Sequence, residues 1–284
     1  MNIKEVSIIG GGTMGNGIAH VFAQNGFHVN LVEQNQEFLD RAIAAITKNL
    51  DRQVKKQTIS NENKEQTLSN IIPVIGISNT PTDSDLVIEA IYENKDAKLS
   101  IFKELDDIVK ADSIFASNTS SISITELSAD YRGEQFIGMH FMNPVPIMKL
   151  VEIIRGYSTS DATFQTIKDL SIKLGKTPVE VYDFPGFISN RILMPMINEA
   201  IFALMENVAS AEDIDTVMKL GMNHPMGPLT LADFIGLDVC LSIMEVLYNG
   251  FNDPKYRPCP LLKKMVAAKK LGRKTGEGFF KYDR

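Results

Sequence analysis

The hydrophobic and polar positions follow two patterns along the chain, and the change comes near residue 185. Before it, short apolar runs alternate with longer stretches in which apolar residues recur every three or four positions. The runs predict strands over 6–9, 28–32, 85–91, 113–117, 136–140, 150–154 and 179–181, and the stretches predict helices over 16–25, 37–56, 61–68, 95–110, 123–127 and 161–174. Such alternation is typical of an α/β fold with a mainly parallel sheet, in which 37–68 forms a helical-hairpin insert.

The second pattern begins after Pro185 and Gly186, beyond which we find no strand pattern. Four helical segments are expected there, the first over 188–208 and the second after Ser210, where Asp213 completes a capping box. We therefore expect two domains, an α/β domain over 1–184 and an all-α C-terminal domain over 185–284. Helices this apolar in a short domain commonly bury a face against a second subunit, which predicts a homodimer.

Composition narrows the class of protein. The 284 residues are 44% hydrophobic and 23% charged, and the formal net charge of −6 argues against nucleic acid as the main partner. Cys240 and Cys259 fit neither a disulfide framework nor a paired metal motif, so no metal site is expected. The first strand begins almost at the first residue, which leaves no space for a leader peptide, and no long apolar segment predicts a membrane span. These features predict a cytoplasmic protein.

The first strand runs directly into the G-x-G-x-x-G sequence Gly10-Gly11-Gly12-Thr13-Met14-Gly15, and a helix follows. In such a sequence Gly10 allows a tight turn, Gly12 lets the backbone approach a pyrophosphate, and Gly15 lets the helix pack closely on the sheet. The next strand ends in Glu33, at the distance where a carboxylate binds a ribose 2′-hydroxyl. The combination predicts a Rossmann-type dinucleotide-binding domain. Because Glu33 would repel a 2′-phosphate and no basic residue directly follows it, NAD is expected rather than NADP.

Two further groups of residues suggest chemistry. Lys48, Arg52, Lys55 and Lys56 form a basic cluster on the predicted hairpin, which either meets phosphates of a substrate or is simply a solvated helix face.

His140 is the one histidine at the carboxyl end of a predicted strand, where open α/β sheets bind ligands. Glu152, in the following strand, can return to the same edge of the sheet and accept a hydrogen bond from one imidazole nitrogen, which would favour the imidazolium. The pair would then act as acid and base, while a packed histidine at a strand end fits the same sequence equally well.

Several runs of the chain closely resemble the 3-hydroxyacyl-CoA dehydrogenase family, and the likeness extends from end to end. They are 10–15, 117–121 (SNTSS), 139–146 (MHFMNPVP), 149–152 (KLVE), 185–191 (PGFISNR), 224–228 (HPMGP) and 272–279 (GRKTGEGF). Two positions depart from the family's pattern, because Met142 stands where relatives often carry Phe and Glu33 where Asp is common. Both substitutions keep the chemical class.

The resemblance implies roles for single residues. His140 is similar to the family's catalytic acid and base and Glu152 to its partner, while Ser120 and Asn190 correspond to residues that hydrogen-bond the substrate near the reacting carbon. Lys56 matches a lysine near the CoA portion. The residues that match cofactor contacts are Gly10, Gly11, Gly12, Thr13, Met14, Gly15, Glu33, Glu93, Lys98, Ser120, Asn143 and Lys274.

The activity implied by the resemblance is the NAD-dependent interconversion of (S)-3-hydroxybutyryl-CoA, or another short-chain 3-hydroxyacyl-CoA, with its 3-keto form. Two rival interpretations stay open. An NAD-binding sensor or structural protein would use the same scaffold, although the pairing of His140 with Glu152 argues against it. A dehydrogenase of a free hydroxy acid is the other, because neither His140 nor Glu152 recognises CoA.

Overall fold

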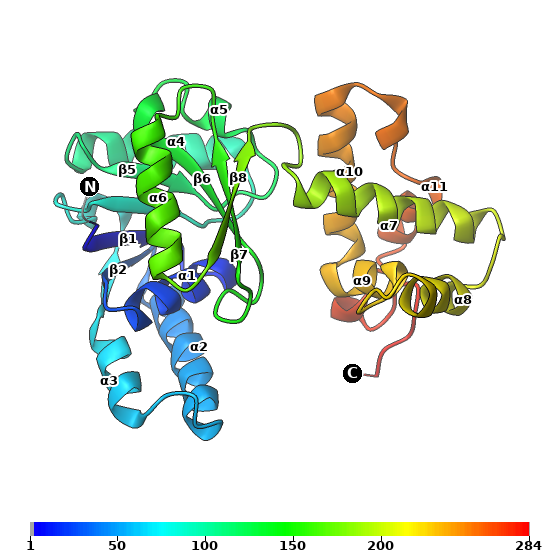
Figure 1. Ribbon diagram of the computed structural model, residues 1–284, viewed down its shortest axis with the longest axis horizontal. Coiled ribbons are helices and arrows are strands. Elements are labelled where there is room, and N and C mark those ends of the chain that lie inside the picture. The colour runs from blue at the N-terminus through cyan, green and yellow to red at the C-terminus, as the bar shows by residue number, and fades with distance from the viewer. Residues whose placement is uncertain (1–2, 284) are drawn as a thin grey trace. The chain divides into compact units, whose positions relative to one another are not determined.

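The chain folds into two compact units that meet in sequence after Asp183. The computed structural model describes residues 3–283 (Figure 1). The first unit contains an eight-stranded sheet with helices packed on it, and the second contains helices and, among residues 184–283, no strand. The α/β fold class with an all-α C-terminal part is confirmed.

The sheet of the first unit has the strand order β3-β2-β1-β4-β5-β6-β7-β8. Its strands are β1 (Glu5–Ile9), β2 (His28–Glu33), β3 (Ile71–Ile75), β4 (Leu86–Glu89), β5 (Ile114–Ser117), β6 (Phe136–Phe141), β7 (Leu150–Arg155) and β8 (Thr177–Tyr182). Strands β1 to β6 are all parallel to one another. β7 pairs with β6 antiparallel, and β8 runs parallel to β7. The order reverses between β1 and β4, which opens a crevice beyond the carboxyl ends of these strands.

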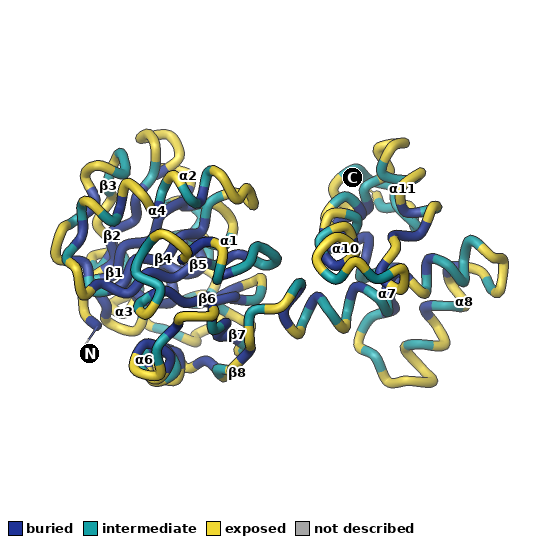
Figure 2. The backbone as a smooth tube through the Cα atoms, turned by 90° about the horizontal axis from the view of Figure 1, so that it is seen from above, coloured by how far each residue is buried: buried dark blue, intermediate teal, exposed yellow. Residues whose placement is uncertain are grey.

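The sheet is buried on both faces, and this explains why its central strands are continuously apolar. On β5, Ile114 and Ala116 belong to the core formed with the first and sixth helices, while Phe115 points to the opposite face. There its ring lies 5.5 Å from that of Phe102, which in turn lies 4.6 Å from the ring of Phe136. Figure 2 shows these strands as the buried centre of the unit.

The helices of the first unit, except the first, begin at residues whose side chains cap free amide groups. They are α1 (Thr13–Gln24), α2 (Gln36–Lys55), α3 (Asn61–Ser69), α4 (Lys95–Ile108), α5 (Ile124–Leu127) and α6 (Asp161–Lys173). Asn35, Asn94, Ser123 and Ser160 each accept a hydrogen bond from an amide in the first turn, and Ser60 forms a capping box with Asn63. α2 and α3 form the expected hairpin, which extends away from the sheet (Figure 1).

The sequence pattern missed one strand of this unit. β3 contains Pro73 and lies at the edge of the sheet, where it pairs only with β2. Proline within an apolar run argues against a strand, because it cannot donate to the sheet, but an edge strand tolerates it; Ile72 and Ile75 of β3 are exposed. The expected start of α1 also moves, from residue 16 to Thr13.

Among residues 184–283 the second unit has five α-helices and shorter helical turns, where the sequence pattern predicted four helical segments. The α-helices are α7 (Ser189–Met205), α8 (Ala211–Thr216), α9 (Pro228–Ile235), α10 (Leu237–Phe251) and α11 (Pro260–Ala267). The cap expected at Ser210 is confirmed, since its side chain accepts from the Asp213 amide, while the Asp213 carboxylate accepts from the Ser210 hydroxyl. Gly236, at φ +104°, separates α9 from α10 within a continuous apolar stretch, which is why the pattern alone did not divide them. Cys240 and Cys259 are buried in this core.

Two buried aspartates organise the second unit. Asp215 accepts hydrogen bonds from the amides of Leu229 and Thr230, each 2.9 Å long, and so satisfies the start of α9. Asp233 accepts from the amides of Phe279 and Phe280, also at 2.9 Å, and holds the C-terminal segment. Among residues 3–283, no helix is both long and apolar enough to cross a lipid bilayer.

Candidate active site

The glycine turn after β1 is built from close backbone approaches. Gly10 has φ +96°, and a Cβ on Gly15 would lie 1.7 Å from the Gly10 carbonyl oxygen, so both positions require glycine. A Cβ on Gly12 would meet no protein atom within 4 Å. The first hydrogen bond of α1 runs from the Asn16 amide to the Gly12 carbonyl, so the preceding amides can bind an anion. The expected turn and close helix packing are confirmed, and the open side at Gly12 leaves space for a phosphate.

A cavity of about 680 Å³ opens beside this turn. It is lined by residues at the ends of β1, β2 and β4, including Gly12, Glu33, Ala90 and Tyr92. The Glu33 carboxylate accepts hydrogen bonds from the amides of Gly11, at 2.7 Å, and Gln34, at 3.1 Å. Backbone amides therefore hold a negative charge at the edge of the cavity, where the sequence predicted a partner for a ribose hydroxyl.

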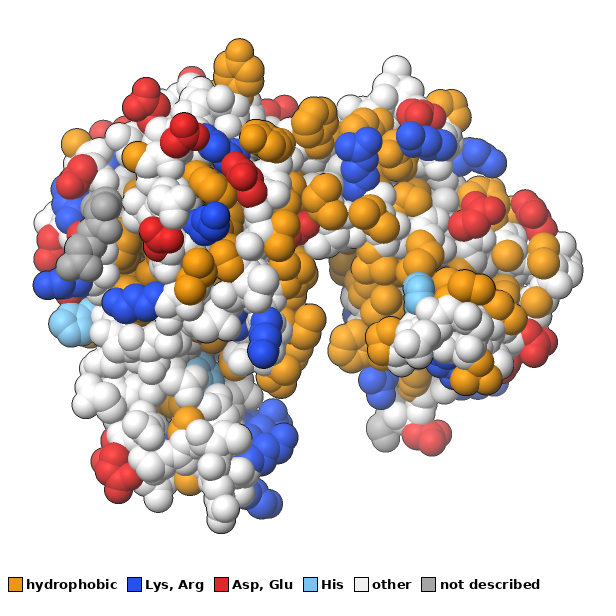
Figure 3. Space-filling model, in the orientation of Figure 1, with side chains coloured by type: hydrophobic (Ala, Val, Ile, Leu, Met, Phe, Trp, Pro, Cys, Tyr) orange, Lys and Arg blue, Asp and Glu red, His pale blue; other side chains and the backbone are white. Residues whose placement is uncertain are grey.

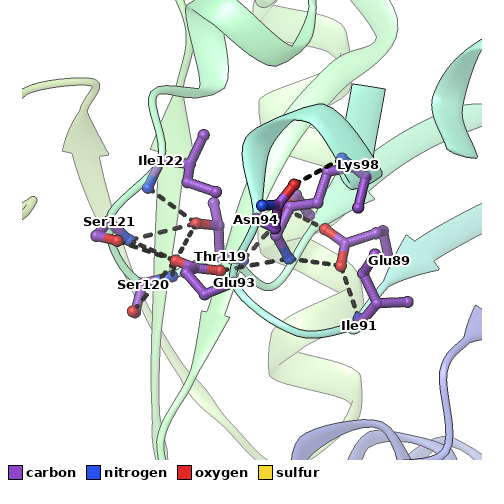
Figure 4. A network of polar contacts seen from close by, with 11 residues as sticks. Glu89, Ile91, Glu93, Asn94, Lys98, Thr119, Ser120, Ser121 and Ile122 are labelled. Atoms are coloured by element: carbon purple, nitrogen blue, oxygen red, sulfur yellow. Dashed lines mark hydrogen bonds and ion pairs between the residues drawn. The ribbon is translucent and has the colours of Figure 1, made fainter. Parts of the chain in front are cut away.

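A network of charged residues connects β4, α4 and the loop after β5 (Figure 4). Lys98 is 1% exposed, and its Nζ lies 2.6 Å from Glu89 and 3.3 Å from Glu93. Glu93 accepts hydrogen bonds from the Thr119 hydroxyl and from the amides of Ser120 and Ser121. Burial by itself would raise the pKa of Glu93, but Lys98 and the donors of the loop outweigh it and hold that pKa below its usual range.

The His140 and Glu152 side chains meet across neighbouring strands. The antiparallel register of β6 and β7 places the two residues opposite each other, and His140 Nδ1 lies 2.7 Å from Glu152 Oε2. His140 is 9% exposed and Glu152 is 2% exposed. The hydrogen bond orients the imidazole ring.

The loop between β6 and β7 contains Asn143, which is exposed and lies at a cis peptide bond to Pro144. Lys176, directly before β8, donates hydrogen bonds to the carbonyls of Val145, at 2.5 Å, and Met148, at 2.8 Å. Val145 is buried against α1, where a Cβ on Gly17 would lie 2.9 Å from its side chain. The loop is thus fastened to the helix that begins at the glycine turn.

Three predicted residues lie away from these groups in sequence. Lys56 caps the C-terminus of α2 and is exposed at the tip of the hairpin, where Figure 3 shows Lys and Arg side chains gathered. Asn190 is buried in the first turn of α7, and Lys274 Nζ lies 2.6 Å from Asp238. Asn190 and Lys274 belong to the second unit, whereas all the other predicted site residues belong to the first.

The whole sequence matches one protein family. The NAD binding domain of 3-hydroxyacyl-CoA dehydrogenase matches residues 5–184, and the C-terminal domain of the same family matches residues 186–282. The chain belongs to the 3-hydroxyacyl-CoA dehydrogenase family. It is an enzyme with an NAD-binding Rossmann domain, as the sequence motifs predicted.

Several members of the 3-hydroxyacyl-CoA dehydrogenase family are close relatives. A probable 3-hydroxybutyryl-CoA dehydrogenase of Deinococcus radiodurans is 59% identical over 279 residues, which cover 98% of this chain and 100% of the relative. A mitochondrial hydroxyacyl-coenzyme A dehydrogenase of Homo sapiens is 45% identical, with 99% and 91% covered. The crystal structure of an (S)-3-hydroxybutyryl-CoA dehydrogenase from Ralstonia eutropha superposes with a TM-score of 0.97, at 50% identity and with both chains fully covered.

Glu89 is a residue of the site that the sequence analysis did not select. It ends β4, is fully buried, and accepts hydrogen bonds from Lys98 and from the Ser117 hydroxyl, each 2.6 Å long. A signal was present, because Leu86-Val87-Ile88-Glu89 is a strand expected to be buried on both faces, and an acidic residue in such a strand needs a partner. The identity of that partner could not be read from the spacing of charges alone.

Proposed function

We propose that this enzyme interconverts (S)-3-hydroxybutyryl-CoA and acetoacetyl-CoA, or another short-chain 3-hydroxyacyl-CoA and its 3-keto form, with NAD as the hydride carrier. The observation that carries the proposal is the buried hydrogen bond between His140 and Glu152 at the carboxyl end of β6. An imidazole oriented by a buried carboxylate can take a proton from a hydroxyl and return it, as hydroxyl oxidation requires. The names of close relatives support the choice of substrate.

The chain's residues would move one proton in each direction. With Nδ1 bonded to Glu152, the proton of the substrate's 3-hydroxyl passes to Nε2 of His140 as its O–H bond breaks. NAD, when bound, supplies the acceptor for the hydride that leaves the same carbon. In reduction the imidazolium returns its proton to the 3-keto oxygen. Glu152 stabilises the imidazolium in both directions because its charge lies 2.7 Å away.

The residues of the first unit fit NAD. The space at Gly12 and the amides of Thr13, Met14 and Gly15 would hold the pyrophosphate, with Gly10 and Gly11 shaping the turn. Glu33 would bind a ribose hydroxyl and repel a 2′-phosphate, which favours NAD over NADP. The remaining cofactor contacts in this proposal are Glu93, Lys98, Ser120, Asn143 and Lys274.

Three residues are the proposed contacts of the substrate. Ser120 and Asn190 would bond the substrate near its reacting carbon, and Lys56 would meet the CoA portion. In this proposal the domain over 1–184 binds the cofactor, and the domain over 185–284 supplies substrate contacts and the surface for a second copy of the chain.

The direct test follows the absorbance of NADH after acetoacetyl-CoA is added. We expect rapid NADH oxidation, slower oxidation with NADPH, and none with free acetoacetate. Oxidation with free acetoacetate at a similar rate would favour a dehydrogenase of free hydroxy acids. NADH binding without oxidation would favour a sensor.

A further inference from the structure

We propose that Glu89 is a positioning residue that holds the 118–121 loop in the shape the cofactor and substrate need. The inference rests on the function proposed above, in which Glu93 and Ser120 contact these ligands. Glu89 lies under the loop at the end of β4, and the structure connects it to the loop by two separate routes.

Burying the Glu89 carboxylate at this position costs free energy of folding. Its side chain is fully buried between central strands, and burial raises the pKa of this carboxyl, an effect that Lys98 and the hydrogen bonds only partly offset. A buried ion pair of this kind rarely contributes more stability than apolar side chains of the same size. Glu89 is therefore better explained by what it holds in place than by the stability of the sheet.

The first route passes through Lys98 and Glu93. Glu89 Oε1 accepts from Lys98 Nζ at 2.6 Å, and the same ammonium lies 3.3 Å from Glu93 Oε2. The other oxygen of Glu93 accepts from the Ser120 amide at 3.0 Å and the Ser121 amide at 3.1 Å (Figure 4). Glu89 thus holds the Lys98 ammonium in place, and Lys98 in turn holds the Glu93 carboxylate that binds the loop.

The second route passes through Ser117. Its hydroxyl donates to Glu89 Oε2 at 2.6 Å and accepts from the Thr119 amide at 3.2 Å. Asn118, between them in sequence, accepts at Oδ1 from the Phe141 amide at 3.0 Å. Phe141 follows His140 directly, so the loop that Glu89 holds is also tied to the strand end that carries the imidazole.

Fixing a loop before its ligand arrives changes affinity in a predictable way. A loop without these bonds samples other shapes, and the apparent dissociation constant rises by the inverse of the fraction in the right shape. Once both ligands are bound, their own contacts order the loop. Loosening the loop should therefore weaken NADH binding strongly and lower kcat only slightly.

The test compares two buried serines at opposite ends of β5. Ser117→Ala removes the second route, whereas Ser113→Ala removes an equally buried hydroxyl that donates to the Ser84 carbonyl at 2.6 Å, away from the loop. We expect Ser117→Ala to raise the NADH dissociation constant about tenfold, the loss that one or two buried hydrogen bonds would cause. We expect kcat with both ligands saturating to stay within about threefold of the unsubstituted enzyme. Ser113→Ala should lower the urea midpoint and leave the NADH dissociation constant within about twofold.

A second variant changes Glu89 alone and leaves Lys98 in place. Glu89→Gln keeps the length of the side chain and removes its charge, while Lys98 keeps Glu93 as a carboxylate partner. We expect Glu89→Gln to bind NADH at least about tenfold more weakly, and its urea midpoint shows whether the variant is folded. NADH dissociation constants are read from the coenzyme's own fluorescence without acyl-CoA.

The outcomes separate this inference from the proposed function. Unchanged NADH affinity in both Ser117→Ala and Glu89→Gln would overturn the positioning role while the unsubstituted enzyme still oxidises NADH. An equal loss of NADH affinity in Ser113→Ala would overturn it too, because general loosening of the sheet would then explain the effect. An unsubstituted chain that does not oxidise NADH with acetoacetyl-CoA would instead contradict the proposed function.

Discussion

At the scale of single residues, the site is formed by polar side chains that hold one another inside an apolar sheet. His140 and Glu152 come from strands of opposite direction, and the register of β6 and β7 brings them to 2.7 Å. Glu33, by contrast, is held by two backbone amides rather than by another side chain. The imidazole therefore depends on its partner strand, whereas the Glu33 carboxylate depends only on the glycine turn and its own neighbour.

Replacement of the imidazole should separate chemistry from cofactor binding. His140→Gln keeps a polar side chain and removes the group that exchanges the proton, so we expect turnover to fall by about a hundredfold or more. The NADH dissociation constant should change by less than about twofold, because the substitution touches no predicted cofactor contact. Steady-state kinetics and NADH titration measure the two effects, and His28→Gln, at an exposed position, is the control. Near-normal turnover in His140→Gln would remove this residue from the mechanism.

The carboxylate at the end of β2 should control which coenzyme is used. A 2′-phosphate placed beside Glu33 would set like charges close together, so we expect a higher kcat/KM with NADH than with NADPH. Glu33→Gln keeps the length of the side chain and removes the charge. It should lower the ratio of kcat/KM with NADH to kcat/KM with NADPH at least about tenfold, mainly by raising kcat/KM with NADPH. A preference for NADPH in the unsubstituted enzyme would refute the assignment.

At the scale of elements, α1 joins the glycine turn to the helical hairpin. His20 on its buried face lies 3.1 Å from Gln53 of α2, measured from Nε2 to the amide nitrogen. Burial lowers the pKa of His20 to about 4, while a hydrogen bond with Gln24 opposes the shift and Lys176 adds to it. The contact between α1 and α2 therefore contains an imidazole that stays neutral at physiological pH.

This imidazole should lower the free energy of unfolding of the enzyme at acidic pH. The unfolded chain protonates His20 near its ordinary pKa of 6.5, but the folded chain does so only near 4. The unfolded state therefore binds more protons as pH falls below 6.5, and the His20 contribution to stability should drop by about 2 kcal/mol by about pH 5. Urea unfolding of His20→Gln and of the unsubstituted enzyme, from about pH 7.5 to about pH 5, measures the difference.

The difference in free energy of unfolding between the unsubstituted enzyme and His20→Gln should shrink by about 2 kcal/mol between about pH 7.5 and about pH 5. His28→Gln keeps His20 and should keep its acid dependence. A constant difference between His20→Gln and the unsubstituted enzyme across this range would contradict the assignment.

At the scale of the whole molecule, the chain contains two separate cores. One fills the space between the sheet and its helices, and the other lies among α7 to α11. Large apolar side chains also remain on the surface of the second unit, and Figure 3 shows several of them on the face it presents. Ile192 is 68% exposed and Leu220 is 82% exposed. Exposed apolar side chains of this kind are the observation behind the expected homodimer.

We expect the enzyme to sediment with twice the mass of one chain. Leu220→Glu should weaken the dimer at least about tenfold, because it places a charge in an apolar contact. Tyr157→Glu changes a side chain that is 93% exposed on the first unit and should leave the mass unchanged. Sedimentation equilibrium measures both, and a single-chain mass for the unsubstituted enzyme would refute the homodimer.

Local rules acting along the chain were enough to predict much of this molecule from its sequence. The turn at Gly10, the close packing at Gly15 and the cap at Ser210 depend on neighbouring residues only, and all three are confirmed. The α/β order also follows from periodicity. β3 escaped prediction because Pro73 interrupts its apolar run, a residue that only an edge strand tolerates, and the break at Gly236 was hidden inside an apolar stretch.

Pairings between distant residues were decided by the tertiary structure. The sequence by itself determined that a dinucleotide turn, an acid at the end of the second strand and a histidine at a strand end are present. Only strand order and register brought Glu152 opposite His140, and only the packing of α4 on β4 placed Lys98 between Glu89 and Glu93. The reason is physical: backbone propensities act over a few residues, whereas a buried charge is stabilised by whichever partner the completed fold places within hydrogen-bond distance.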